Sequence, residues 1–242
     1  MDGKGKSEEG EEKRNFPNFD PSSIGYETYQ MSGSYDYQFK IEWEMTSPDQ
    51  DPFLMTQLLS DNKKHFAMQM KNATGKKGET GTFIYDFEKH EIIILVDSEK
   101  MAMVTNSHTV EEAMDDAIEE SLVEQNQEDF NFVMTGKKKQ ILGYTCEQYT
   151  YTNEDGSGEV WITKDLKYSN YDLYSYMQQS TRRKKKQTTP ASWEKIKDGF
   201  ALESIHTLED GQTVKMVAKV IDDNANVNIN LDGYEAMKVT KK

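Results

Sequence analysis

The stretch YDYQFKIEWEM, at positions 35–45, alternates apolar and polar side chains over its whole length. Successive side chains of a β-strand point to opposite faces of a sheet, so this period of two predicts one long strand with one buried and one wet face. The buried face would carry Tyr35, Tyr37, Phe39, Ile41, Trp43 and Met45. This segment predicts that the chain is built around a β-sheet.

Further strand-length segments follow at short intervals. They lie at 52–60, 64–71, 80–88, 91–97, 100–106, 139–152, 159–166, 200–208, 213–221 and 224–231. Segments rich in turn-forming residues separate them, such as SDNKK, NATGKKGETG, NEDGSG at 153–158 and EDGQ at 209–212. Strands joined by short turns favour an antiparallel meander over alternating strand and helix units. The expected fold class is therefore mainly β, an antiparallel sheet with a few helices.

The apolar period changes between positions 109 and 125. Apolar or small residues recur there every three or four positions, at Val110, Ala113, Met114, Ala117, Ile118, Ser121 and Leu122, while acidic residues occupy the opposite face. This spacing predicts an amphipathic helix over 109–125. A partly helical spacing over 170–180 predicts a second helix, and we expect both to cover the sheet. The acidic face is interpreted as solvated, since no loop gathers oxygen ligands as calcium sites do.

Composition and charge limit the possible domain organisation and partners of the chain. Residues 1–22 are charged and Gly-rich, so we expect a flexible tether followed by a single β domain over 23–242. A net charge of −14 argues against nucleic acid as the main partner, because phosphate binding needs clustered cations. The RRKKK run at 182–186 is interpreted as a solvated loop, with contact to anionic lipid headgroups as the alternative. We find no apolar run of membrane-spanning length and no signal-peptide segment, so we expect either a cytoplasmic protein or an exported one whose signal has been removed.

The chain has one cysteine, Cys146, and four histidines. One cysteine cannot form an internal disulfide, and the histidines lack metal-ligand spacing, so we expect no metal site and no cofactor. A catalytic thiolate needs an activating histidine or a helix N-terminus, whereas Cys146 lies in mid-strand on a face shared with Leu142 and Tyr144. Cys146 is therefore interpreted as a small buried side chain, and the protein as one that is not an enzyme.

The segment GKKKQILGYTCEQYTYTNEDGSGEVWITKDL, at 136–166, carries a specific motif. Its elements are Gly-Lys-x-Lys-x-Ile-x-Gly-Tyr-x-Cys, a short turn and a Val-Trp-Ile-Thr-Lys-Asp-Leu strand. The segment resembles a family of exported bacterial proteins of unknown function, which are similar to the periplasmic lipoprotein carriers of the LolA and LolB type. The resemblance implies a curved antiparallel sheet, an open half-barrel that wraps around helices and encloses an apolar cavity. It also implies a periplasmic or outer-membrane-tethered protein.

The residues and this resemblance together favour a non-enzymatic envelope protein that binds an apolar or lipid-like ligand between sheet and helices. Methionine adapts to irregular apolar shapes, and Met68 with Met70, like Met101 with Met103, falls in a same-face pair. The candidate cavity residues are Phe39, Ile41, Trp43, Met68, Met70, Met101, Met103, Met114, Ile118, Leu122 and Trp161. Ordinary core packing is the alternative for each methionine.

The alternative for the whole chain is an envelope protein-interaction or structural module without a small-molecule ligand. Such a module would use an envelope protein partner or peripheral contact with the membrane surface. Under both hypotheses we expect a monomer.

Overall fold

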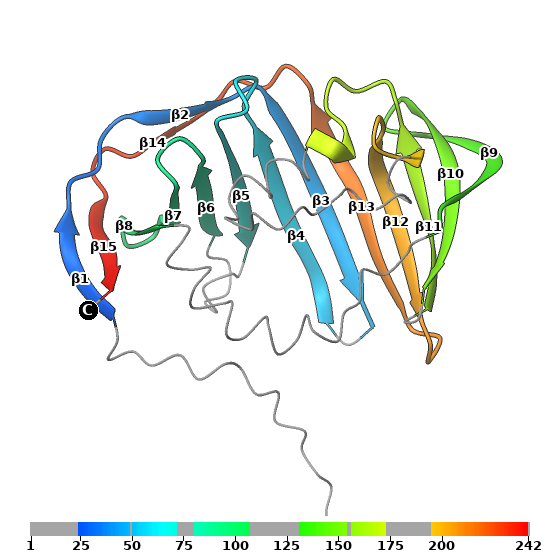
Figure 1. Cartoon of the computed structure of the whole chain (residues 1–242), viewed down its shortest axis with the longest axis horizontal. Coiled ribbons are helices and arrows are strands. Elements are labelled where there is room, and N and C mark those ends of the chain that lie inside the picture. The colour runs from blue at the N-terminus through cyan, green and yellow to red at the C-terminus, as the bar shows by residue number, and fades with distance from the viewer. Residues whose placement is uncertain are drawn as a thin grey trace, which may run out of the picture.

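A computed structural model describes residues 24–48, 50–71, 80–106, 131–153, 156–172 and 195–241. Within these ranges the chain forms fifteen strands, and thirteen of them make one curved sheet (Figure 1). The prediction of a mainly β fold is confirmed. The expected helix over 109–125 and most of that over 170–180 lie outside the described residues. The expected tether over 1–22 and the basic run at 182–186 lie outside them as well.

Six consecutive strands form the first half of the sheet, each antiparallel to the next. They are β3 (Phe39–Ser47), β4 (Gln50–Leu59), β5 (His65–Lys71), β6 (Thr80–Asp86), β7 (Glu91–Val96) and β8 (Met101–Asn106). Each of the strands expected between 52 and 106 has a counterpart among β4 to β8. The predicted meander is confirmed for this half.

A second antiparallel meander forms the other half of the sheet. Its strands are β9 (Val133–Ile141), β10 (Tyr144–Asn153), β11 (Gly156–Thr163), β12 (Phe200–Leu208) and β13 (Thr213–Asp222). The turn expected at 209–212 joins β12 to β13, as predicted. β13 pairs with β3, so strands far apart in the sequence join the two meanders.

The sheet is mixed, and the expectation of a wholly antiparallel sheet is wrong at one pair of strands. β15 (Glu235–Lys241) lies between β8 and β1 (Ile24–Tyr29), parallel to β8 and antiparallel to β1. A parallel pair needs a long connection rather than a hairpin, and here the whole second meander lies between the two strands. β1 and β15 lie at one end of the curved sheet and β9 at the other (Figure 1).

The strand predicted over 35–45 is broken at Gln38. β2 (Ser34–Tyr37) ends there and pairs with β14 (Val227–Asn230) in a separate two-stranded sheet, whereas β3 begins at Phe39. The Gln38 backbone N–H donates to the Leu59 carbonyl at 3.1 Å, which fixes the chain at the point where it passes between sheets. The prediction of one continuous strand is therefore wrong, although the alternation of buried residues continues through the break.

Two clusters of buried side chains lie on opposite faces of the first meander. Neighbouring residues of a strand point to opposite faces, and Leu58 packs in the cluster of Tyr35 and Tyr37 while Leu59 packs in that of Phe39. The two-stranded sheet of β2 and β14 therefore covers one face of the first meander. The other face continues from the aromatic cluster around Phe39.

The segment predicted as one strand over 139–152 is a hairpin. β9 ends at Ile141 and β10 begins at Tyr144, and Leu142 and Gly143 form a two-residue turn with φ of 52° and 87°. Positive φ at both positions is the requirement of a type I′ turn, which glycine meets without strain. Leu142 is exposed in this turn, so the prediction that it shares a buried face with Cys146 is wrong.

Candidate functional site

Four of the predicted cavity residues are methionines on one face of the first meander. Met68 and Met70 belong to β5, and Met101 and Met103 belong to β8. Strand register aligns two of them with apolar residues of the neighbouring strands. The resulting row across β5, β6, β7, β8 and β15 is Met68, Phe83, Ile94, Met103 and Met237.

A second row lies beside the first, one residue pair further along the strands. Its members across β4 to β8 are Met55, Met70, Gly81, Val96 and Met101. We call these two rows the methionine face. Met103 is 37% exposed and Met237 is 39% exposed, and the other apolar side chains of both rows are half-buried. The methionine face is therefore an apolar surface with partial access to solvent.

The sequence pattern does not predict four further members of this face, Met55, Phe83, Ile94 and Met237. The alternation at 80–86 and 91–96 gives each strand two faces, but it does not say which faces align across strands. Cross-strand register supplies that information. Met237 joins through the parallel pairing of β15 with β8, to which no local pattern points.

The predicted aromatic members lie in the adjacent packed core. Phe39, Ile41 and Trp43 of β3 are almost wholly buried, and Trp161 of β11 belongs to the same cluster. The Trp43 indole N–H donates to Gln57 Oε1 at 3.0 Å. Met55 and Met68 pack against this cluster, so the methionine face begins where the aromatic core ends. The remaining predicted residues, Met114, Ile118 and Leu122, lie outside the described residues.

The hairpin motif forms a second constellation of side chains, built around Lys139. Its ammonium lies 4.0 Å from the centre of the Trp161 ring and 2.7 Å from Glu203 Oε2. Lys215 contacts Glu203 Oε1 at 3.2 Å. Burial opposes ionisation of Glu203, but hydrogen bonds from both lysines outweigh it and lower the pKa of this carboxyl.

Cys146 pairs directly opposite Lys139 and is wholly buried. Burial raises the pKa of its thiol to about 11, and the nearby Lys139 ammonium only partly opposes this. A nucleophilic cysteine needs the reverse shift, toward a thiolate at neutral pH. Burial of Cys146, as predicted, is confirmed.

The described ranges contain no group of three or more His, Cys, Asp or Glu side chains arranged to hold a metal ion. In the same part of the chain, no helix combines the length and apolar character needed to cross a membrane.

Residues 39–228 match a family described as a domain of unknown function, DUF4412. A comparison with curated proteins finds no match. Among solved structures, an uncharacterized conserved protein from Thermus thermophilus is similar with a TM-score of 0.44 and 6% identity, over 84% of this chain and 90% of that one. A LolA superfamily protein from Nitrosomonas europaea is similar with a TM-score of 0.24 and 9% identity, over 77% and 85%. MucB, solved in complex with MucA(peri), has a TM-score of 0.31 and 10% identity, over 77% of this chain and 50% of MucB. The family match covers most of the chain and includes the hairpin motif at 136–166, and the chain belongs to the DUF4412 family.

Proposed function

We propose that the protein is a non-enzymatic envelope protein that binds an apolar or lipid-like ligand on the methionine face. The observation that carries this proposal is the pair of cross-strand rows whose apolar side chains keep partial access to solvent. Contiguous apolar surface of this kind marks interaction sites, because leaving it in water is unfavourable. Unbranched methionine side chains adapt their shape to an irregular apolar partner.

The predicted residues take different parts in this proposal. Met68, Met70, Met101 and Met103 contact the ligand, and the buried aromatic cluster around Trp43 closes one end of the face. We further propose that segment 109–125, which lies outside the described residues, would contribute Met114, Ile118 and Leu122 to ligand binding. Replacing Ile118 and Leu122 by Asp would place charge against apolar surface, so we expect the double variant to keep its β-sheet and lose ligand capacity.

The resemblance of the hairpin motif to exported bacterial proteins supports a location in the periplasm or at the outer membrane. The same resemblance supports an envelope protein or lipid as the partner. In this proposal the buried Cys146 thiol takes no part in chemistry.

A pair of matched variants tests the methionine face. Met103 and Leu54 are 37% and 41% exposed, but Leu54 lies on the opposite face of the sheet, next to Met55 in β4. We expect Met103→Asp to weaken binding of 11-(dansylamino)undecanoic acid by about tenfold or more, because the new carboxylate would lie against the ligand chain. Leu54→Asp should bind the probe like the wild type, and circular dichroism should show the same β-sheet content for all three proteins.

A second candidate function, a protein-interaction module, is favoured by the sheet edge. Among the described strands β9 pairs on one side only, with β10, and its Val133 and Met134 side chains are exposed. An unpaired strand edge offers backbone donors and acceptors to a strand of another protein. A wild-type protein that binds no probe and releases no lipid on organic extraction would contradict the carrier proposal and favour this second candidate.

A further inference from the structure

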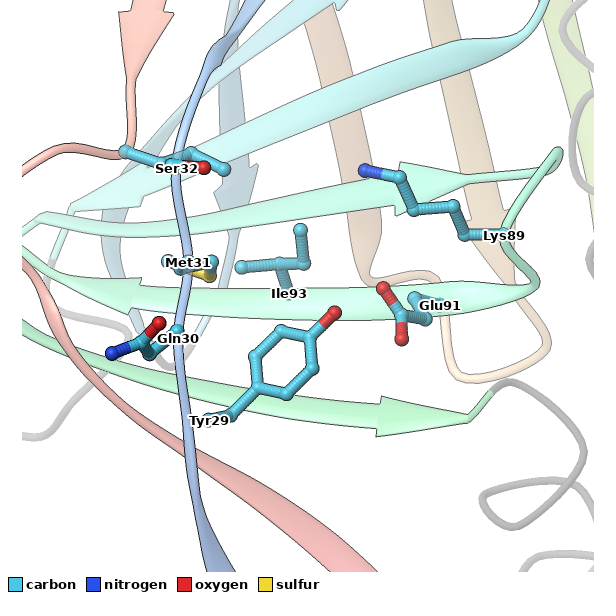
Figure 2. Close-up of a pocket in the computed structure, with 8 residues that line it drawn as sticks. Tyr29, Gln30, Met31, Ser32, Lys89, Glu91 and Ile93 are labelled. Atoms are coloured by element: carbon cyan, nitrogen blue, oxygen red, sulfur yellow. The ribbon is translucent and has the colours of Figure 1, made fainter.

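A hollow of about 210 Å³ lies on the sheet face opposite the methionine face, beneath the connection from β1 to β2 (Figure 2). Ile93 and Leu231 line it, and Tyr29 and Met31 form part of its wall. Ile93 is the neighbour of Ile94 in β7, so the hollow and the methionine face are on opposite sides of the same strand. The hollow is therefore separate from the surface proposed to bind lipid.

Glu91 brings a buried negative charge to this hollow. Its side chain is 9% exposed, and its Oε1 accepts a bond of 2.8 Å from the Lys238 ammonium. Lys238 also lies 4.9 Å from the centre of the Tyr29 ring, and its bond to Glu91 raises the pKa of this lysine. Within the described part of the chain, Glu91 Oε2 has no hydrogen-bond partner. A largely buried carboxylate with one oxygen unpaired offers an acceptor to a ligand.

Lys89 brings a positive charge to the same hollow, and Asp86 holds it there. Asp86 Oδ1 accepts a bond of 2.9 Å from the Lys89 backbone N–H, and Oδ2 lies 3.3 Å from the Lys89 ammonium. The ammonium also donates to the Tyr35 hydroxyl at 3.2 Å. An ammonium has three N–H donors, so these two contacts leave one for a ligand.

Charges of both signs surround the hollow: the lysines Lys89 and Lys238 face the carboxylates of Asp86 and Glu91, and Glu27 of β1 pairs opposite Lys238. Figure 2 shows the Lys89 side chain reaching toward the hollow from the side on which the Glu91 carboxylate lies. A zwitterion satisfies the spare donor and the spare acceptor together, whereas a ligand with a single charge satisfies only one of them. The volume is below the roughly 300–1,000 Å³ of pockets for drug-sized molecules, so the ligand is compact.

We propose that this hollow binds a small amino-acid-like zwitterion. The ligand ammonium would donate to Glu91 Oε2, its carboxylate would accept from the Lys89 ammonium, and its aliphatic part would lie against Ile93. This site is independent of lipid binding on the opposite face.

Three probes of one shape test the charge requirement. Leucine carries both charges, 3-methylbutylamine lacks the carboxylate, and 4-methylpentanoate lacks the ammonium. In calorimetric titrations of the whole protein we expect leucine to bind about tenfold or more tightly than either single-charge probe, since each lost charge removes a charge-assisted hydrogen bond. No measurable leucine binding, or an amine or acid that binds as tightly as leucine, would overturn the proposal.

Variants then assign the contacts. Lys89→Met leaves the Glu91 to Lys238 pair intact, and Lys64→Met is its control, because Lys64 forms an exposed pair with Glu88 next to the same turn. We expect Lys89→Met to weaken leucine binding about tenfold and Lys64→Met to leave it unchanged. Glu91→Gln should also weaken binding, with two-dimensional amide spectra showing that the fold is kept. Equal affinities for the two lysine variants would refute the assignment even if leucine binds elsewhere on the protein.

Discussion

The ammonium of Lys139 lies over the indole ring of Trp161, 4.0 Å from its centre. The two residues lie on the first and third strands of the motif segment, β9 and β11, and β10 runs between these strands. The same ammonium bonds Glu203 of β12, so one side chain links β9 to β11 and β12. The sequence motif therefore marks a contact that holds the end of the sheet together.

Replacing Lys139 by methionine should lower the free energy of unfolding by about 1–3 kcal/mol, because it removes a cation–π contact and a charge-assisted hydrogen bond. Lys139→Arg should retain most of the stability, since a guanidinium can stack on the ring and bond Glu203. Urea unfolding measures both variants. Lys138→Met is the control, because Lys138 forms only an exposed pair with Glu147. If Lys138→Met lowered the free energy of unfolding as much as Lys139→Met, the role given to Trp161 would be contradicted.

The Cys146 thiol should react slowly with a bulky disulfide reagent in the native protein and quickly in urea. It is wholly buried, and its pKa of about 11 leaves little thiolate at pH values near the ordinary cysteine pKa of about 8.5. Absorbance at the wavelength of the released thiol follows the reaction. Cys146→Ala should keep its affinity for the dansylated fatty-acid probe. Rapid native labelling would show that the thiol is accessible.

Asp86 should make the protein sensitive to acid. Burial opposes its ionisation, but hydrogen bonds from Tyr35 and Lys89 outweigh that effect and lower the pKa of this carboxyl. A lowered pKa in the folded state stabilises the protein above the unfolded value of about 3.9, and the contribution is lost as the pH falls through the folded value. Urea unfolding at neutral pH and at about pH 3 measures how much the free energy of unfolding falls in acid. This decrease should be smaller for Asp86→Asn than for the wild type. Equal losses would place the acid sensitivity on other carboxylates.

Gly158 should be hard to replace, because its neighbours occupy the space of a side chain. A Cβ at this position would overlap the Tyr151 ring and lie 2.7 Å from the Ile205 carbonyl oxygen. Tyr151 stacks on His206 at an interplanar angle of 7°, and its hydroxyl lies 3.1 Å from His206 Nδ1. We expect Gly158→Ala to cost about 1–3 kcal/mol in urea unfolding. Ser157→Ala, at the exposed neighbouring position, should have little effect.

The sequence predicts individual strands well and their partners poorly. Alternation between 80 and 106 predicts three strands. Short turns join them, so each strand is correctly expected to pair with the next. Gln38 escapes prediction because the alternation keeps its phase while the chain changes sheets. Leu142 escapes it because leucine is an uncommon residue at positive φ and gives no turn signal.

The sites depend even more on distant pairings. The methionine pairs within β5 and within β8 are visible in the sequence, but their alignment with Phe83 and Ile94 depends on register. The hollow is less visible still, because Tyr29, Glu91 and Lys238 come from three separate segments. Only the folded sheet brings a lysine of β15 to a carboxylate in β7.

The position of β15 ties the first and last of the described strands into one structural unit. Among these strands β1 pairs only with β15, and the ribosome makes β15 after all the others. In the nascent protein β1 must therefore wait for β15 before it can join the sheet, and the border of the sheet at β8 stays open until then. Deleting β15 would therefore also leave β1 without its partner strand in the sheet. A tag fused next to either strand would lie at the same edge of the sheet.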